Sequence, residues 1–87
     1  MIPNKGKVLV DFYAEWCGPC KAMKPTLEKF EESSDIPLVK VNVDEEPNIA
    51  QEYGIRNIPC LVCVEDGNEV KRRIGVAGLD QLLELVK

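Results

Sequence analysis

Residues 7–21 have the sequence KVLVDFYAEWCGPCK, and this stretch decides the fold. Its first part, Lys7–Tyr13, is short and rich in β-branched and aromatic residues, which predicts a strand buried on both faces. The segment Trp16–Lys21 follows this strand closely and leads into a predicted helix from Gly18 to about Ser33. Apolar side chains recur at helical spacing along this helix. Pro25 lies inside this helix and should kink it, because a proline there removes one backbone hydrogen bond.

Five further segments carry strand or helix patterns. They are a strand at Leu38–Val43, a short helix at Asp44–Tyr53, strands at Pro59–Val64 and Glu69–Ile74, and a closing helix at Leu79–Val86. Asp66-Gly67 lies between the last two strands and is a strong hairpin signal. The order β-α-β-α-β-β-α predicts a parallel βαβ crossover followed by an antiparallel hairpin. We therefore expect one α/β domain over residues 1–87, with a mixed four-stranded sheet and helices on both faces.

The composition excludes several classes of function. The chain has 11 basic and 15 acidic residues, and its net charge of −4 argues against nucleic acid as the main partner. The longest apolar run, Leu61–Val64, is far shorter than the ~20 residues that span a bilayer. The absence of histidine excludes Ser-His-Asp and Cys-His catalysis and any metal site with an imidazole ligand. Residues 1–6 lack the apolar segment of a secretory signal, so we expect a cytoplasmic protein.

Four cysteines form two C-x-x-C pairs, Cys17 with Cys20 and Cys60 with Cys63. The first pair opens the predicted helix, where unpaired backbone N–H groups and the positive helix pole stabilise a thiolate. We therefore expect the pKa of Cys17 to lie below the free value of about 8.5. Cys20, one turn further, is shielded and keeps its proton longer, so Cys17 attacks and Cys20 resolves. Pro19 suits the first helical turn, where its missing N–H would have no partner.

The segment Val10–Lys21 resembles the active-site segment of the thioredoxin family almost residue for residue, and the resemblance covers nearly the whole chain. Further matches follow in the family's order: Pro25, Lys40–Asp44, Tyr53–Arg56, Ile58–Pro59, Asp66–Gly67 and Gly75. A C-x-x-C motif alone is weak evidence for this family. The motif W-C-G-P-C between a strand and a helix, followed by I-P about 40 residues later, is much more specific evidence. The resemblance implies a thiol–disulfide oxidoreductase that reduces protein disulfides.

The resemblance also implies roles for individual residues. Ile58-Pro59 would form a cis-proline loop beside the cysteines, with the backbone of Ile58 free to pair with an extended substrate peptide. Asp11 would be buried beneath the cysteines, where desolvation raises its pKa and lets it exchange a proton with Cys20. Lys40 would lie near Asp11 and moderate that shift. Trp16 would shield the cysteines and help to form the docking surface.

The resemblance further implies the reaction partners. The expected substrates are proteins that contain a disulfide, and the electrons would come from a reductase or another dithiol, with no cofactor on this chain. Gly18-Pro19 resembles the dipeptide of reducing members, and we expect a monomer. The chain starts just before what would be the family's second strand, so we expect a minimal version of the fold. Tyr13 stands where many members carry a second tryptophan, and Cys60 replaces the usual threonine after the cis-proline.

The second cysteine pair and a basic cluster have no role in that reaction. Strand alternation places Cys60 and Cys63 on opposite faces, where they could pack as small apolar side chains. Cys60 adjoins the predicted cis-proline, so it could instead act as an extra thiol or metal ligand near Cys17. Lys71–Arg73 is expected to form a solvated edge strand that discourages pairing between sheets.

Two rival functions stay open at this stage. One is a metal module in which four thiolates hold zinc or an iron–sulfur cluster, although the gap of 39 residues between the pairs exceeds the usual gap of about 15–20. A dimer could still assemble such a site from Cys17, Cys20 and Cys60. The other rival is a binding subunit that grips a partner through the surface around Trp16 and Ile58, with redox chemistry incidental.

Overall fold

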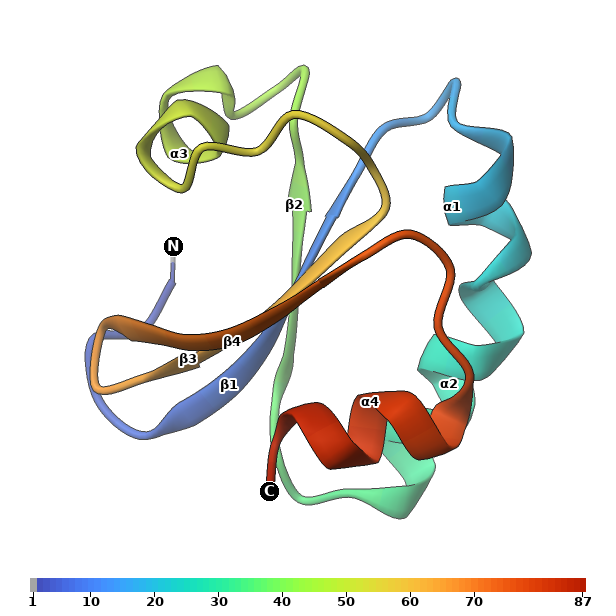
Figure 1. Ribbon diagram of the computed structural model, residues 1–87, viewed down its shortest axis with the longest axis vertical. Coiled ribbons are helices and arrows are strands. Elements are labelled where there is room, and N and C mark those ends of the chain that lie inside the picture. Colours follow the sequence, from blue (N-terminus) through green and yellow to red (C-terminus); the bar gives the residue numbers. More distant parts are fainter. Residues whose placement is uncertain (1) are drawn as a thin grey trace.

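Strand β1 (Lys7–Tyr13) lies inside a four-stranded sheet with the order β2-β1-β3-β4 (Figure 1). Figure 1 shows a computed structural model, which describes residues 2–87. The other elements are α1 (Gly18–Ala22), α2 (Lys24–Ser33), β2 (Leu38–Asn42), α3 (Pro47–Glu52), β3 (Cys60–Glu65), β4 (Asn68–Ile74) and α4 (Leu79–Leu85). β1 runs parallel to β2 and antiparallel to β3, and β3 runs antiparallel to β4. The predicted mixed sheet is therefore confirmed.

The sheet buries apolar side chains on both faces, and helices cover both of them, as the sequence predicts (Figure 1). On one face, Leu9 of β1 packs in a cluster with Phe30 of α2 and Leu82 of α4. On the other face, Val10 of β1 packs in a second cluster against Ile49 of α3. Because neighbouring residues of a strand point to opposite faces, β1 is buried on both sides along most of its length.

The predicted single helix from Gly18 to Ser33 is wrong, because the chain forms two helices that meet at Met23. Pro25 lies in the first turn of α2 and has no N–H, so it cannot donate to the carbonyl of Lys21. The N–H of Met23 instead bonds the carbonyl of Cys20 at 3.2 Å. Proline also favours the start of a helix, so the break replaces the predicted kink and leaves the two cysteines at a short helix of their own.

The predicted helix at Asp44–Tyr53 is also wrong at its start, since α3 begins only at Pro47. The side-chain oxygen of Asn42, at the end of β2, accepts hydrogen bonds from the N–H groups of Asp44 at 2.9 Å and Glu45 at 3.3 Å. This local side-chain turn competes with helix formation and delays it. No helix within residues 2–87 is long and apolar enough to cross a membrane.

The predicted hairpin joins β3 to β4, and β4 is an edge strand of the sheet, as expected. Asp66 and Gly67 at the turn have φ values of 54° and 83°, the left-handed conformation that tight hairpin turns require. The N–H of Gly6 donates to the carboxylate of Asp66 at 2.8 Å, which ties the entry to β1 against the hairpin.

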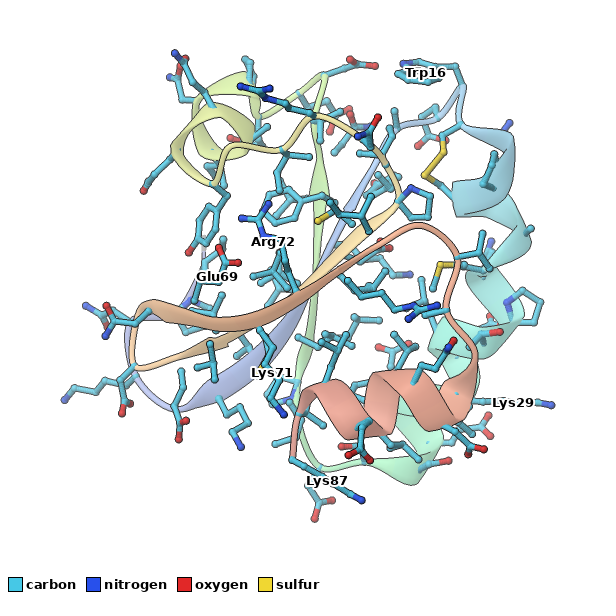
Figure 2. The ribbon with its side chains drawn as sticks, viewed as in Figure 1. Trp16, Lys29, Glu69, Lys71, Arg72 and Lys87 are labelled. Atoms are coloured by element: carbon cyan, nitrogen blue, oxygen red, sulfur yellow. A yellow bond between two sulfur atoms is a disulfide. The ribbon has the colours of Figure 1, made fainter. Side chains whose placement is uncertain are left out.

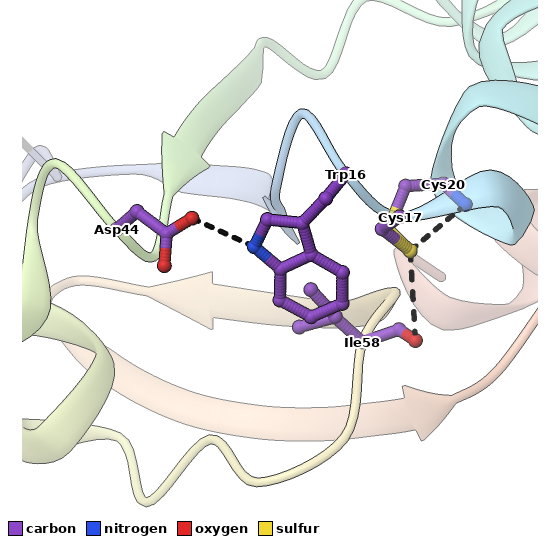
Figure 3. Close-up of a disulfide and its surroundings, with 5 residues drawn as sticks. All are labelled: Trp16, Cys17, Cys20, Asp44 and Ile58. Carbon is purple, nitrogen blue, oxygen red and sulfur yellow. Dashed lines mark hydrogen bonds between the residues drawn. A yellow bond between two sulfur atoms is a disulfide. The ribbon is translucent and has the colours of Figure 1, made fainter.

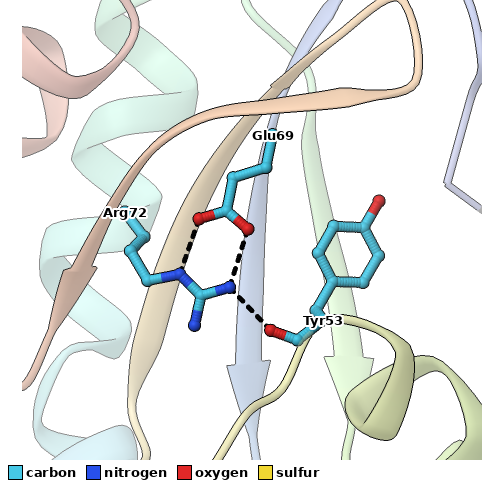
Figure 4. A network of polar contacts seen from close by, with 3 residues as sticks. All are labelled: Tyr53, Glu69 and Arg72. Carbon is cyan, nitrogen blue, oxygen red and sulfur yellow. Dashed lines mark hydrogen bonds and ion pairs between the residues drawn. The ribbon is translucent and has the colours of Figure 1, made fainter.

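Arg72 departs from the predicted solvated cluster, because it is half-buried in a polar network (Figures 2 and 4). Its Nε and Nη2 donate to the two carboxylate oxygens of Glu69 at 2.6 and 2.7 Å. Nη2 also donates to the backbone carbonyl of Tyr53 at 2.6 Å. Tyr53 follows α3, whose last carbonyls lack partners within the helix, so this contact ties the edge strand to the end of α3.

We predict that Glu69→Gln lowers the free energy of unfolding by about 1 kcal/mol at pH 7, because it weakens a half-buried charged pair. Hydrogen bonds from Arg72 hold the pKa of Glu69 below its ordinary value of 4.5. Its stabilisation is therefore present above pH 4.5 and is lost as the pH falls through the folded pKa. Urea unfolding at pH 7 and at pH 3 measures both effects.

The matched control is Glu84→Gln, which removes the charge from an exposed pair with Lys87. This change should lower the free energy of unfolding by less than about 0.5 kcal/mol. If Glu69→Gln costs no more than the control at pH 7, the network does not stabilise the edge strand.

Candidate functional site

Cys17 occupies the N-cap of α1, directly before the first helical residue, Gly18. Its Sγ accepts a hydrogen bond from the backbone N–H of Cys20 at 3.2 Å, and its own N–H donates to the carbonyl of Ala14 at 3.2 Å. Pro19 fills the first turn, as the sequence predicts. The N–H group that points at Sγ favours a negative charge on this sulfur, which is the electrostatic condition for a reactive thiolate.

A disulfide joins Cys17 to Cys20 (Figure 3), with their Cα atoms 5.3 Å apart. Both residues are buried, with 3% and 8% of their surface exposed. They pack in a small apolar cluster with Ala14, and the half-buried side chains of Val43 and Ile58 lie against it. Gly18 between them is exposed, and a methyl group added there would meet no heavy atom within 4 Å. The first C-x-x-C pair is therefore a formed disulfide near the protein surface.

The loop before β3 lies against this disulfide. The peptide bond between Ile58 and Pro59 is cis. The Sγ of Cys17 lies 3.9 Å from the carbonyl oxygen of Ile58 (Figure 3). The carbonyl of Pro59 accepts a hydrogen bond from the N–H of Gly75 at 2.8 Å, which attaches the loop to the residue after β4. Two segments that are distant in the sequence thus meet at the sulfur.

Asp11 is the buried carboxylate of the site, with 4% of its surface exposed on β1. Burial raises its pKa from the ordinary value of 3.8 to about 6, and the positive charge of Lys40 opposes part of this rise. Lys40 is exposed on β2 and lies beside Asp11 in the parallel register. Both residues line a cavity of about 450 Å³ together with Cys20. The structure therefore brings a carboxyl with a pKa near neutrality to the same cavity as the second cysteine.

Trp16 is the most exposed large hydrophobic residue of the site, with 69% of its surface accessible (Figure 2). Its Nε1 donates to the carboxylate of Asp44 at 2.8 Å (Figure 3). Sequence reasoning did not select Asp44 or Asn42, whose side chain holds the Asp44 turn. The sequence does contain a signal for this turn: Asn42 stands at the end of a strand, two positions before Asp44. An Asn at such a place often accepts a hydrogen bond from the backbone N–H two residues later. The indole is thus oriented beside the cysteines by a segment that follows β2.

Cys60 and Cys63 are free, buried and on opposite faces of the sheet, as strand alternation predicts. Burial raises the pKa of both thiols, which keeps them protonated and poorly reactive. Cys60 belongs to a different apolar cluster from Cys17 and Cys20. Within residues 2–87, no group of three or more Cys, Asp or Glu residues is arranged to hold a metal ion. These positions favour core packing for the second pair.

Comparisons with known proteins agree with this geometry. The family model for thioredoxin matches residues 1–87. The chain belongs to the thioredoxin family. It is 48% identical over 82 residues to a thioredoxin of Chlamydia caviae, an alignment that covers 93% of this chain and 80% of the relative. A thioredoxin of Mycoplasmoides gallisepticum is 42% identical in an alignment 88 residues long, which covers 100% of this chain and 88% of that protein.

Solved thioredoxin structures have the same fold. A mutant thioredoxin from Halobacterium salinarum superimposes with a TM-score of 0.88 at 40% identity, over 95% of this chain and 74% of the other. Mitochondrial thioredoxin 3 from Saccharomyces cerevisiae, in its oxidised form, gives a TM-score of 0.82 at 36% identity, over 93% and 77% of the two chains. The family and the disulfide between Cys17 and Cys20 together identify a thiol–disulfide oxidoreductase.

We predict that Asp11→Asn raises the free energy of unfolding of the oxidised protein by about 2–3 kcal/mol at pH 8. The pKa of Asp11 is raised on folding from 3.8 to about 6, so the wild type loses stability as the pH rises through this interval. The variant carries no charge there, and its advantage should largely vanish at pH 4. Urea unfolding at both pH values measures the difference.

The control for this prediction is Asp35→Asn, which changes an exposed carboxylate outside the cavity that Asp11 lines. It should be neutral within about 0.5 kcal/mol at both pH values. Equal stability of the wild type and Asp11→Asn at pH 8 would show that no buried charge is carried at Asp11.

Proposed function

We propose that this chain reduces disulfides of cytoplasmic proteins by dithiol–disulfide exchange, with Cys17 as the attacking and Cys20 as the resolving cysteine. The observation that carries the proposal is the position of the two sulfurs. Cys17 caps α1 and accepts the N–H of Cys20, whereas Cys20 lies one turn inside and shares a cavity with Asp11. One sulfur is thus favoured as an anion, and the other has a proton acceptor beside it.

The reaction proceeds in two exchanges. In the reduced protein, the Cys17 thiolate attacks one sulfur of the substrate disulfide, and the other substrate sulfur leaves as a thiolate and takes up a proton. The Cys20 thiol then loses its proton, and its sulfur attacks Sγ of Cys17. The second substrate sulfur leaves, so the substrate gains two electrons and the enzyme ends with the Cys17–Cys20 disulfide. The disulfide of the structure is the product of this cycle.

Asp11 and Lys40 are proposed to manage the proton of Cys20. A carboxylate with a pKa of about 6 is ionised at neutral pH, yet it is basic enough to accept a thiol proton during the resolving step. Lys40 keeps that pKa from rising further, since its charge favours the ionised carboxylate. The cavity that both residues line with Cys20 also has room for water to carry the proton.

The substrate is proposed to bind across the surface formed by Trp16, Gly18-Pro19 and Ile58-Pro59. The exposed indole and the open space above Gly18 offer an apolar platform beside the disulfide. The carbonyl of Ile58 is within 3.9 Å of the Cys17 sulfur, so a peptide paired with the Ile58 backbone would carry its own sulfur close to the nucleophile.

The partners of this cycle are disulfide-containing proteins and a reductase or dithiol that returns the electrons. The reducing direction requires a compartment that keeps thiols reduced, which supports a cytoplasmic location. Each chain carries both cysteines and Asp11, so a monomer is sufficient for the reaction. The net charge of −4 supports protein rather than nucleic acid as the substrate.

We predict that the wild type accelerates reduction of a protein disulfide by dithiothreitol, and that Cys17→Ser abolishes this acceleration. Cys20→Ser should retain the first exchange and accumulate a mixed disulfide with the substrate, because no second sulfur resolves it. Turbidity of a precipitating substrate follows the rate, and mass spectrometry under acid quench measures the adduct. The control is Cys63→Ala, a buried thiol outside the site, which should keep the wild-type rate when it folds. Activity in Cys17→Ser would overturn the assignment.

We further predict that Asp11→Asn slows the resolving step by about 100-fold at pH 7, because it removes the proton acceptor of Cys20. In the wild type this step should slow as the pH falls below about 6, where Asp11 becomes protonated. The variant should lack that limb of the pH profile. Single-turnover decay of a preformed mixed disulfide isolates the step, and Asp35→Asn is the matched control. An identical pH profile in Asp11→Asn would exclude Asp11 from proton transfer.

A further inference from the structure

We propose that the outer edge of β4 binds an extended, acidic segment of a partner protein, which adds to the sheet beside Lys71–Ile74. β4 is the last strand in the order β2-β1-β3-β4, so no strand within residues 2–87 covers this edge. Its use in substrate recognition rests on the proposed function, whereas the binding itself does not. The backbone, the groove beside the strand and the charges each support this inference.

The backbone of β4 leaves the hydrogen-bonding groups of two residues unused. The N–H of Gly75 donates to the carbonyl of Pro59, which lies opposite it in the antiparallel register. Hydrogen-bonded and non-hydrogen-bonded pairs alternate along antiparallel strands. Arg73 therefore bonds to β3, whereas the N–H and C=O groups of Arg72 and Ile74 point away from it. An added peptide strand pairs with such outward groups.

A groove of about 660 Å³ runs between β4 and α4, next to this edge. Lys71 and Arg73 lie opposite Cys63 and Leu61, which belong to the apolar core under α4, so their side chains lie on the groove side of the sheet. Figure 2 shows Lys71 on the α4 side of β4 and Arg72 on the other side. Alternate side chains of an added strand would therefore enter the groove.

Arg73 lines this groove and has few hydrogen-bond partners. Its Nε is buried and has no hydrogen-bond partner among the described residues. Its Nη2 reaches only the carbonyl of Val76, at 3.5 Å. The terminal nitrogens of an arginine guanidinium bind a carboxylate through parallel N–H···O hydrogen bonds, which are stronger than bonds to a neutral acceptor. The Arg73 side chain at this groove therefore favours a carboxylate as its partner.

The charges around the groove leave an excess of basic groups. Glu84 of α4 pairs with Lys87 at 3.0 Å, and Arg72 pairs with Glu69. Of the other charged residues that line the groove, Lys71 and Arg73 lie on the strand and Asp80 lies on the helix. No ion pair within 4.0 Å joins these three residues in the part of the chain that the structure describes.

The same charges decide which strand can bind. A second copy of β4 would bring its own Lys71 and Arg73 against these residues, and like charges on facing strands repel. An extended segment with acidic side chains toward the groove meets them favourably. Its main chain would pair with Arg72 and Ile74, and one carboxylate would pair with the terminal nitrogens of the Arg73 guanidinium. The occupant is therefore an acidic strand of another protein.

The edge leads directly to the reactive disulfide. β4 ends at Ile74, and the N–H of Gly75 bonds the carbonyl of Pro59, whose cis partner Ile58 lies beside Cys17. A strand bound along β4 would thus direct the chain that continues from it toward the sulfur. For a thiol–disulfide oxidoreductase, this arrangement selects substrates whose acidic extended segment lies close in sequence to the disulfide.

The test uses two eight-residue peptides in which valine alternates with either glutamate or glutamine. Binding to the oxidised chain is measured by titration with NMR detection of the backbone N–H signals. The glutamate peptide should bind about tenfold tighter than the glutamine peptide, since one charged hydrogen bond distinguishes them. The largest shifts should fall on the N–H signals of Arg72 and Ile74.

Two variants separate the backbone from the side chain. Ile74→Pro removes an outward N–H without touching a bond to β3, and it should abolish binding of both peptides. Arg73→Gln should erase the tenfold preference and leave binding of the glutamine peptide unchanged. Lys29→Gln, an exposed change on α2 (Figure 2), is the matched control and should leave both affinities unchanged. A glutamate peptide with N-methyl groups on its edge-facing amides should not bind the wild type.

The inference is overturned if the two peptides bind equally or if neither binds. It is also overturned if the shifts fall on the Ile58 loop instead of β4, or if the N-methylated peptide binds as well as the unmodified one. Reduction of an uncharged disulfide peptide, measured in parallel, should be the same in Arg73→Gln and the wild type. If the wild type does not reduce this peptide, the proposed function is refuted. The peptide titration would still decide whether the strand site exists.

Discussion

Burial of β1 on both faces is the constraint on which the rest of the molecule depends. The strand lies between a parallel and an antiparallel neighbour, and its consecutive residues alternate between two apolar clusters. A strand in this position carries few polar side chains, because a buried charge without partners is costly. Asp11 is the exception, and it places a carboxyl inside the sheet. The same strand ends just before Cys17, so it positions both the carboxyl and the sulfur.

The chemistry of the site follows from this burial. Desolvation raises the pKa of Asp11 to about 6, and Lys40 on the neighbouring strand limits the rise. Burial of this carboxylate lowers the stability of the fold and also brings the pKa of Asp11 close to neutral pH, as the proposed proton transfer requires. Cys17 needs no such partner, since an N–H at the start of α1 already points at its sulfur. Two cysteines three residues apart therefore lie in different surroundings, and the proposed roles of attacking and resolving cysteine rest on that difference.

Local patterns predicted the elements well, and they failed where a side chain competes with the backbone. The strands, the hairpin at Asp66-Gly67 and the helix start at Gly18 follow from local patterns. The break at Met23 depends on which hydrogen bond Pro25 cannot make, and helical periodicity does not report that. The late start of α3 depends on the side chain of Asn42, which bonds the backbone just beyond it. Boundaries of this kind depend on single hydrogen bonds rather than on the average pattern.

The sequence by itself determined the class of fold, the family and the reactive pair Cys17–Cys20, because these depend on residues that are close in the chain. Only the tertiary structure decided what surrounds that pair. It joined Asp44 to the Trp16 indole and set Lys40 beside Asp11. It also gave neighbouring arginines different surroundings. Arg72 pairs with Glu69, whereas the Nε of Arg73 is buried without a hydrogen-bond partner among the described residues. The physical reason is that hydrogen bonding and desolvation depend on which groups are close in space. Local sequence patterns do not indicate which distant segments of the chain will be in contact.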